Sequence, residues 1–139
     1  MVEIDPKIEE FLAKRARNAY VTTLREDGSA STVPVWYDWD GTTLRLFTPP
    51  NSPKIKRLQN DPRITVVIGN EVDEYENWIS FEGKATLNEK GGKALALKCT
   101  SRYWDLSDPK RQKMKAEWEA SSENYFLLIE LVPERIQSI

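Results

Sequence analysis

The stretch from Thr48 to Lys54, "TPPNSPK", has the residue types of an anion-binding site. Ser52 carries a hydroxyl group and Lys54 an ammonium group, and a Ser-Pro pair is typical of the first residues of a helix. The first N–H groups of a helix have no partner within it, so together with the helix dipole they favour a bound anion. Arg57, one turn after Lys54, would add a second charge. The alternative interpretation is that these cations form a solvated basic face of the helix.

The residue types that are missing restrict the chemistry further. The 139 residues include no histidine, which excludes histidine-based catalytic triads, the common zinc sites and imidazole general bases. The single cysteine, Cys99, lies in a predicted helix without a histidine to activate it, and we interpret it as a buried structural thiol. We identify no catalytic side chain and no metal site, and we expect the side chains alone to perform little chemistry.

Length and charge indicate an ordinary globular protein. A chain of 139 residues is expected to form a single domain, residues 1–139, around one core. Its 20 Lys and Arg residues against 22 Asp and Glu residues give a net charge of −2, which argues against nucleic-acid and anionic-membrane partners. No apolar run is long enough for a transmembrane span or a secretory signal, and a lone cysteine suits the cytoplasm. We therefore expect a cytoplasmic protein.

The elements that would position the anion-binding stretch follow from the periodicity. Asp5 and Pro6 predict the start of a helix, and the segment from Asn18 to Arg25 then alternates with a period of two, which predicts a strand. Two Asp-Gly turns, in "EDGS" and "WDGT", connect this strand to two more. The first half of the chain is therefore predicted to be a three-stranded antiparallel meander.

The second strand of this meander, Ser31–Gly41, has an unusual composition. The apolar residues that alternate on one face are Val33, Val35, Tyr37 and Trp39. The opposite face, which would ordinarily be polar, carries Pro34 and Trp36, although proline cannot donate a hydrogen bond within a sheet. Two explanations remain open. Either a ligand or partner lies against this face, or the amino-terminal helix covers Trp36 and Pro34 marks a bulge or an edge strand.

The remaining elements complete an antiparallel β protein. They are a short helix between Ser52 and Asp61, strands at Arg63–Asn70 and Asn77–Leu87, helices at Lys93–Trp104 and Pro109–Ala120, and a closing strand at Asn124–Leu131. Most of the six strands are joined by short hairpins, and closure of such a sheet removes its exposed edges. The predicted fold is mainly β (α+β): a closed or nearly closed six-stranded antiparallel barrel with short flanking helices.

The order of three segments resembles a known family. The segments "VTTLREDGSASTVPVWYDWDGTTLRLFT", "NSPKIKRLQNDPRITVVI" and "WISFEGKATL" are similar to the FMN-binding split β-barrels related to pyridoxamine 5'-phosphate oxidase. The segment "YFLLIELVPERI" is similar to the usual closing strand of that family. Such proteins hold a flavin in a cleft between two subunits. The resemblance thus implies a homodimeric six-stranded split β-barrel with FMN as its cofactor.

The resemblance also implies which residues contact the cofactor. Those along the flavin ring are Val33, Pro34, Val35 and Trp36. Those toward the phosphate are Thr48, Ser52 and Lys54, with the neighbouring Arg57. Trp78 is expected to reach the cofactor from the partner subunit. A flavin beside the second strand would explain why Pro34 and Trp36 occupy its second face.

Two departures separate this chain from true pyridoxamine phosphate oxidases. The second strand has Thr32, Trp36 and Tyr37 where those enzymes have basic residues that grip the phosphate, and the chain lacks the histidine that helps to hold the pyridoxal substrate. We therefore do not expect pyridoxamine oxidation. The weaker phosphate contacts leave room for the deazaflavin coenzyme F-420, which related barrels bind, whereas the lack of histidine disfavours haem.

These inferences combine into one expected function. We expect an FMN-binding, flavin-dependent oxidoreductase in which hydride transfer occurs at N5 of a flavin bound at the dimer interface, with a small molecule as the substrate. The alternatives are a deazaflavin-dependent reductase on the same fold and a flavin-binding or storage module without turnover. A barrel that binds nucleic acid is disfavoured by the charge balance.

Overall fold

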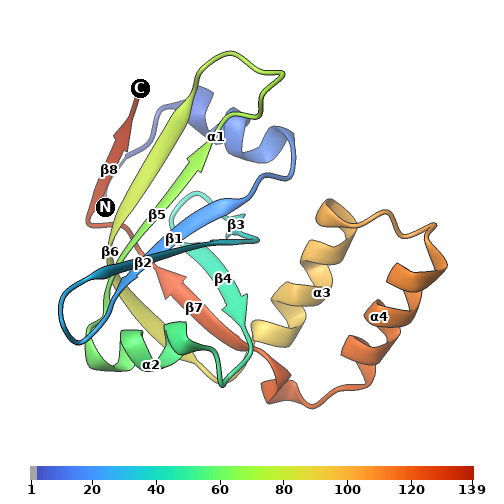
Figure 1. Ribbon diagram of the computed structural model, residues 1–139. Helices are drawn as coiled ribbons and strands as arrows, with labels where there is room; N and C mark the ends of the chain where they lie inside the picture. The colour runs from blue at the N-terminus through green and yellow to red at the C-terminus, as the bar shows by residue number, and fades with distance from the viewer. Residues whose placement is uncertain (1–2) are drawn as a thin grey trace.

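The computed structural model describes residues 3–139, which form a curled β-sheet flanked by helices (Figure 1). The strands are β1 (Ala19–Leu24), β2 (Ala30–Val35), β3 (Asp38–Trp39), β4 (Leu44–Thr48), β5 (Arg63–Gly69), β6 (Trp78–Asn88), β7 (Leu127–Leu131) and β8 (Arg135–Ser138). The helices are α1 (Pro6–Lys14), α2 (Pro53–Asn60), α3 (Gly92–Tyr103) and α4 (Pro109–Ala120), with a 3-10 turn, η1 (Glu123–Tyr125), before β7.

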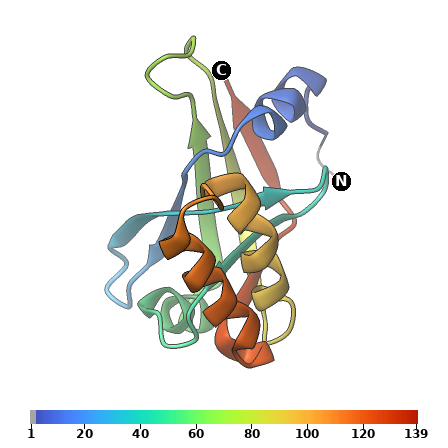
Figure 2. The same ribbon diagram turned by 90° about the vertical axis from the view of Figure 1, so that its right-hand side faces the viewer.

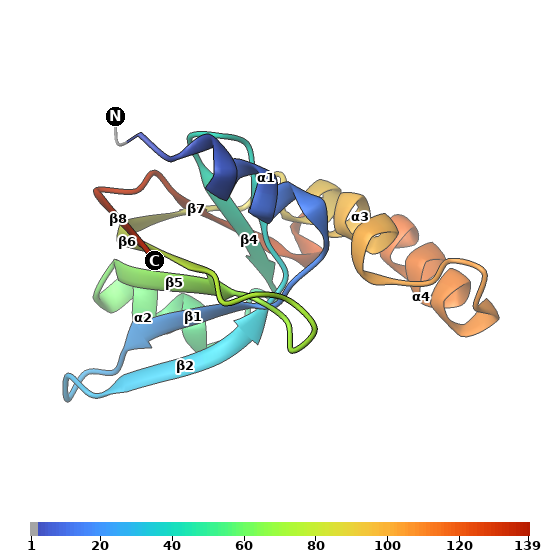
Figure 3. The ribbon, with the colours of Figure 1, turned by 90° about the horizontal axis from the view of Figure 1, so that it is seen from above.

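The strand order β2-β1-β5-β6-β7-β4-β3, antiparallel throughout, makes a split barrel. The long strand β6 belongs to both halves, because Ile79–Glu82 pair with β8 whereas Ala85–Asn88 pair with β7. Gly83 lies between these two pairings, and a Cβ atom there would come within 2.8 Å of the Leu131 side chain. Because Gly83 has no side chain, the segment that connects β7 to β8 can pass close to β6 at this point. Figure 3 shows the resulting curl of the sheet, and the predicted split barrel is confirmed.

The number and pairing of the strands differ from the prediction, since the sheet formed by residues 3–139 has eight strands instead of six. The segment predicted as one strand is divided: β2 pairs with β1 as far as Val35, and β3 then pairs with β4. Tyr37 lies at the division, fully buried, with its hydroxyl group donating to the carbonyl oxygen of Leu12. The predicted three-stranded meander is therefore wrong in its third member, because β4 pairs with β3 and β7 and not with β2.

The eighth strand, β8, follows Pro133 and pairs with the first half of β6. The N–H of Glu134 donates to the carbonyl oxygen of Glu82 and guides the chain into this pairing. Most of the β8 side chains are exposed, so the strand lacks the alternating apolar pattern from which the other strands were predicted.

The core lies between the two halves of the sheet and beneath α1 and α2. Its apolar residues are Ile8, Phe11 and Leu12 of α1, Ile55 and Leu58 of α2, Tyr37, and the strand residues Ala19, Val21, Leu44, Leu46, Ile64, Val66, Ile68, Ile79, Phe81, Ile129 and Leu131. Val33, Val35 and Trp39 pack against this core, which confirms the predicted inward face of their segment. This core fixes the strand ends around which the candidate site is built.

The helices α3 and α4 form a pair that projects from one side of the sheet in Figures 1 and 3 and faces the viewer in Figure 2. Helix α3 packs on β4 and β7, and a Cβ atom at Gly92 would come within 2.4 Å of the carbonyl oxygen of Phe126. Helix α4 packs on α3 and has no fully buried residue. The Lys93 ammonium group donates to the carbonyl oxygens of Glu119 and Ser121, at 2.8 and 2.7 Å, and so holds the end of α4 beside the start of α3.

Cys99 is buried in α3, as predicted for a structural thiol. Burial raises the pKa of its thiol to about 11, so the thiol is protonated at neutral pH and is a poor nucleophile. Among residues 3–139, no helix combines the length and the apolar character needed to cross a membrane.

Candidate functional site

A pocket of about 550 Å³ lies where β2 and β4 end and α2 begins. Its lining residues are Asn18, Pro34, Val35, Trp36, Phe47, Thr48, Pro49, Lys54, Trp104, Arg111 and Trp118. The lining contains two cations and no carboxylate, together with four aromatic side chains. Such a pocket is suited to a planar ligand that carries negative charge.

Two of the expected ring-contacting residues, Pro34 and Val35, line the pocket from the end of β2. β2 is an edge strand, which is a position where the missing N–H of Pro34 costs no bond to a second neighbour. One of the two explanations for Pro34 required an edge strand, and the structure has one. The pocket lies against this same strand, so the structural explanation and a ligand beside β2 are compatible.

Trp36 belongs to a cluster of aromatic side chains on the α3 and α4 side of the pocket. The members of this aromatic cluster are Trp36, Phe47, Tyr103, Trp104, Trp118 and Phe126. The Trp36 ring stacks on the Tyr103 ring, with centroids 4.7 Å apart, and meets the Trp104 ring edge-on at 5.3 Å. The alternative that the amino-terminal helix covers Trp36 is therefore wrong, because α3 and α4 supply these neighbours.

Helix α4 and the end of α3 contribute pocket residues that the sequence analysis missed. These are Trp104, Arg111 and Trp118. The predicted helical segments contained a usable signal, because Arg111 and Trp118 are seven residues apart and so lie on one face of a helix. Three of the five tryptophans in the chain line the pocket, which is a second signal that the helical segment is more than a scaffold.

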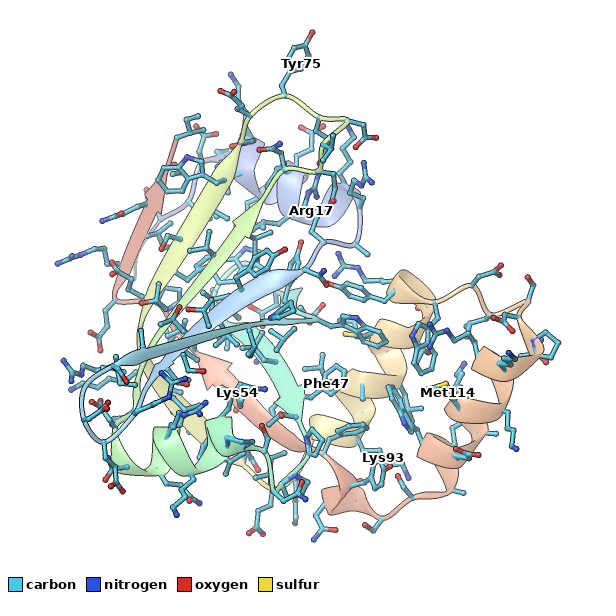
Figure 4. The ribbon with its side chains drawn as sticks, in the orientation of Figure 1. Arg17, Phe47, Lys54, Tyr75, Lys93 and Met114 are labelled. Atoms are coloured by element: carbon cyan, nitrogen blue, oxygen red, sulfur yellow. The ribbon has the colours of Figure 1, made fainter. Side chains whose placement is uncertain are left out.

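The predicted anion-binding stretch lies at the opposite side of the pocket. Thr48, the buried last residue of β4, and Lys54, in the first turn of α2, both line it. Figure 4 shows Lys54 above α2, with Phe47 between it and α4 in this view. Ser52 is the N-cap residue of α2, but its side chain makes no capping hydrogen bond. Ser52 itself does not line the pocket, but it is two residues before Lys54, which does.

Within the part of the chain that the structure describes, the surroundings of Lys54 disfavour its positive charge and supply no negative charge to balance it. Its side chain is half-buried, and burial lowers the pKa of its ammonium group; the positive charge of Arg57 lowers this pKa further. Among residues 3–139, no carboxylate is paired with Lys54, whose environment only disfavours its charge. An anion bound here would offset both penalties through its attraction to the ammonium group.

The other expected site residues lie outside the pocket lining. Val33 packs against the core. Arg57 lines a separate pocket of about 470 Å³ beside the β1–β2 turn, and its guanidinium group donates to the Ser31 hydroxyl group at 3.2 Å. Trp78 is at the start of β6, paired with Gly69, and exposed. Its placement is compatible with the expectation that it serves the site of another subunit.

An exposed apolar strip runs from the pocket across the outer face of the sheet. Pro34 pairs with Tyr20, and Tyr20 pairs with Val67, so the three side chains share one face of β2, β1 and β5. Trp78 is two residues before Ser80, the β6 partner of Val67, and continues the strip on the same face. Tyr20, Val67 and Trp78 are 48%, 36% and 37% exposed. We call Tyr20, Pro34, Val67 and Trp78 the apolar strip.

A slightly larger pocket, of about 590 Å³, lies elsewhere on the sheet and is a weaker candidate. Charged side chains of both signs line it, including Arg63, Glu82, Lys84 and Arg135, and it has no aromatic residue. Its charges can neutralise one another: Arg135 is 3.7 Å from Glu82. The pocket beside Lys54 is distinguished from it by unpaired positive charge and aromatic surface.

Comparisons with known proteins agree with this architecture. No curated protein matches the chain. Among solved structures, an F420 reductase is 20% identical with a TM-score of 0.72, over 92% of this chain and 94% of that one. The conserved hypothetical protein Rv2991 from Mycobacterium tuberculosis is 23% identical with a TM-score of 0.73, over 99% of this chain and 85% of that one. General stress protein 26 from Bacillus anthracis is 22% identical with a TM-score of 0.65, over 93% and 88%.

At these identities the solved structures show a shared fold alone. The comparison with protein families is more specific, because the model of the family described as pyridoxamine 5'-phosphate oxidase matches residues 4–138. That range includes every strand of the split barrel and every residue of the pocket. This chain therefore belongs to the pyridoxamine 5'-phosphate oxidase family.

Proposed function

We propose that this protein is an FMN-dependent oxidoreductase, with the flavin ring beside β2 and the phosphate at the start of α2. The observation that carries the proposal is the environment of Lys54. Its half-buried ammonium group faces a pocket without carboxylates, and its pKa is lowered by burial and by Arg57. A phosphate group would supply the negative charge that this cation lacks, in the form of a charge-assisted hydrogen bond.

The other residues of the pocket fit the same ligand. The hydroxyl groups of Thr48 and Ser52 would add donors at the phosphate end, and the N-terminus of α2 favours negative charge. Pro34, Val35 and Trp36 offer apolar and aromatic surface to a planar ring. The fit thus includes both ends of a flavin mononucleotide.

A bound flavin would supply the redox chemistry, since it can accept and donate a hydride. The residues of this chain would bind and orient it and exclude water, for which the aromatic cluster is well placed on one side of the pocket. The thiol of Cys99 takes no part, because it is buried in the packing of α3. We assign no side chain to proton transfer.

We further propose that the working form is a homodimer. The apolar strip begins at Pro34, which also lines the pocket, so a second copy seated on the strip would cover the open side of the pocket. Exposed apolar surface of this kind is unfavourable in a monomer, and two-fold pairing would bury it twice. The exposed Trp78 of each copy would then be available to the site of the other.

A deazaflavin-dependent reductase is the second candidate. The observation that favours it is the absence of a basic residue from β2, which leaves Lys54 as the main contact for an FMN phosphate. The F420 reductase among the similar structures has the same fold, and this gives a reason to test the deazaflavin coenzyme directly. A flavin-binding module without turnover would have the same pocket and differ only in activity.

Equilibrium titration with FMN, riboflavin and coenzyme F-420 distinguishes these functions. We expect FMN to bind at least about tenfold more tightly than riboflavin, because riboflavin lacks the phosphate. Tighter binding of the deazaflavin would favour the second candidate, and failure of all three to bind would contradict both. For a protein that binds FMN, reduction of the flavin followed by reoxidation with a panel of acceptors separates an enzyme from a storage module.

A further inference from the structure

We propose that Arg111 is a substrate-specificity residue that selects planar aromatic substrates carrying a carboxylate or a similar acidic group. The assignment to a substrate rests on the proposed function, because it takes the Lys54 side of the pocket to be occupied by the cofactor. The assignment of an acid-binding position to Arg111 rests on the structure of the pocket itself.

The first observation is that, within the described residues 3–139, the Arg111 guanidinium group has no oxygen partner. Each of the other eight arginines, all within residues 3–139, contacts a carboxylate, a hydroxyl group or a carbonyl oxygen. Among residues 3–139, the Arg111 guanidinium group donates only to the sulfur atom of Met114, at 3.7 Å. A guanidinium group has five N–H donors in a planar fork that matches a carboxylate, so Arg111 enters the pocket with its strongest interactions unused.

The second observation is the aromatic surface next to this cation. The Arg111 guanidinium carbon lies 4.9 Å from the centroid of the Trp104 ring, a distance at which a cation is attracted to the ring face. Trp118 lies two turns later on the same face of α4, and its ring centroid is 4.8 Å from that of Trp104. Arg111 is thus held against the Trp104 ring, which packs on the Trp118 ring, and both indoles line the pocket. This arrangement suits a flat ring with an acidic substituent.

The third observation is that the two cations of the pocket come from different elements. Lys54 is on α2, and Arg111 is on α4, one turn before Met114. In Figure 4, Phe47 lies between Lys54 and Met114. A cofactor phosphate at Lys54 therefore leaves the α4 side of the pocket with its own positive charge. Two separate positions for anions are more than one phosphate requires.

Helix α4 is rich in basic residues, but this composition alone does not explain why Arg111 lines the pocket. Helix α4 also carries Lys110, Lys113 and Lys115, but none of them lines the pocket. Lys113 is exposed and provides a matched control, because its substitution removes the same charge from the same helix. A general effect of charge on binding would be shared by Arg111 and Lys113, whereas a direct contact would be specific to Arg111.

Isothermal titration calorimetry with 2-naphthoate and its neutral analogue 2-naphthamide tests the proposal, on the 139-residue protein before and after addition of FMN. We expect wild type to bind naphthoate about tenfold more tightly than naphthamide. Arg111→Gln should weaken naphthoate binding about tenfold and leave naphthamide binding unchanged. Arg111→Lys should restore part of the preference, since it keeps the charge but not the planar fork. Lys113→Gln should behave as wild type.

Equal affinity of wild type for the two probes, or no detectable binding of either, would overturn the proposal. The proposal would also be overturned if Arg111→Gln and Lys113→Gln lost the preference for naphthoate over naphthamide to the same extent. The same holds if Lys54→Gln removed this preference and Arg111→Gln kept it. Light scattering on Arg111→Gln tests a different role for this residue. If the assembly state changes and binding of both probes does not, Arg111 is an interface residue and the proposal is overturned. If FMN fails to bind while the Arg111-dependent preference persists, the cofactor proposal fails and this inference stands.

Discussion

The indole ring of Trp36 stacks on the phenol ring of Tyr103, with centroids 4.7 Å apart and ring planes 8° apart. The Tyr103 hydroxyl group donates to the carbonyl oxygen of Arg17 at 2.6 Å and accepts from the N–H of Tyr37 at 3.3 Å. The last residue of α3 is therefore fixed to the segments before β1 and after β2. Tyr103 thus holds Trp36 in place beside the pocket and joins the helical pair to the barrel.

Substitution of Tyr103 should separate the stacking from the hydrogen bonds. Tyr103→Phe keeps the ring and should lower the free energy of unfolding by about 1 kcal/mol, with FMN affinity nearly unchanged. Tyr103→Ala removes the ring and should cost about 3 kcal/mol, and it should also weaken FMN binding because Trp36 loses its neighbour. Urea unfolding and flavin titration measure the two effects. Unchanged FMN affinity in Tyr103→Ala would show that the orientation of Trp36 does not matter for binding.

Lys54→Ala tests the phosphate contact. We expect a loss of about 10- to 100-fold in FMN affinity, because a charge-assisted hydrogen bond worth roughly 1.5–3 kcal/mol is removed. Riboflavin should bind wild type and Lys54→Ala with similar affinity. Lys56→Ala is the matched control, since Lys56 is exposed on the same helix and lies outside the pocket. An equal loss for FMN and riboflavin would mean that Lys54 supports the shape of the pocket instead.

The lowered pKa of Lys54 predicts a conflict between stability and binding. Its charge is disfavoured in the flavin-free fold, so Lys54→Met should raise the melting temperature of the flavin-free protein while it weakens FMN binding. The unfolded state holds the Lys54 proton more tightly than the folded state does. The stability of wild type relative to Lys54→Met should therefore rise as the pH increases through the lowered pKa toward the ordinary value of 10.5. Thermal unfolding of both proteins across this alkaline range measures the effect. A difference in melting temperature that stays constant with pH would mean that Lys54 is solvated, contrary to this prediction.

Val67→Asp tests the apolar strip. Val67 lies in the middle of the strip, between Tyr20 and Ser80 of the neighbouring strands, and a carboxylate there would be buried without a partner in the proposed dimer. We expect the variant to be monomeric and to bind FMN more weakly. Val132→Asp is the control, because Val132 is also an exposed valine but lies on the link between β7 and β8. Multi-angle light scattering distinguishes the outcomes, and a Val67→Asp dimer would place the interface elsewhere.

Parts of the fold that depend on local chemistry were predictable from the sequence. The Asp-Gly turn between β1 and β2 and the Ser-Pro start of α2 follow from residues near in sequence, and both are present. The pairing of β4 with β7 joins strands about 80 residues apart, and no local pattern in β4 distinguishes β7 from β2 as its partner. The strands β3 and β8 are short or largely exposed, so they have little apolar periodicity to detect.

The candidate site likewise contains residues that could be predicted from the sequence and residues that could not. Lys54 was identified from the Ser-Pro helix start, Pro34 because a proline is unusual within a strand, and Thr48 through the resemblance to the family. Trp104, Arg111 and Trp118 were missed because their position depends on how α3 and α4 pack against the end of β4. Their spacing indicates a shared helix face, but only the folded chain places that face beside Trp36.

Native mass spectrometry of the freshly purified protein tests the central claim most directly, because one spectrum gives the number of chains and the mass of any bound cofactor. We predict an assembly of two chains and two FMN molecules, with the FMN lost from Lys54→Ala at protein concentrations at which wild type retains it. A monomer that remains without FMN after the cofactor is added in excess would contradict the proposed site and the proposed dimer together.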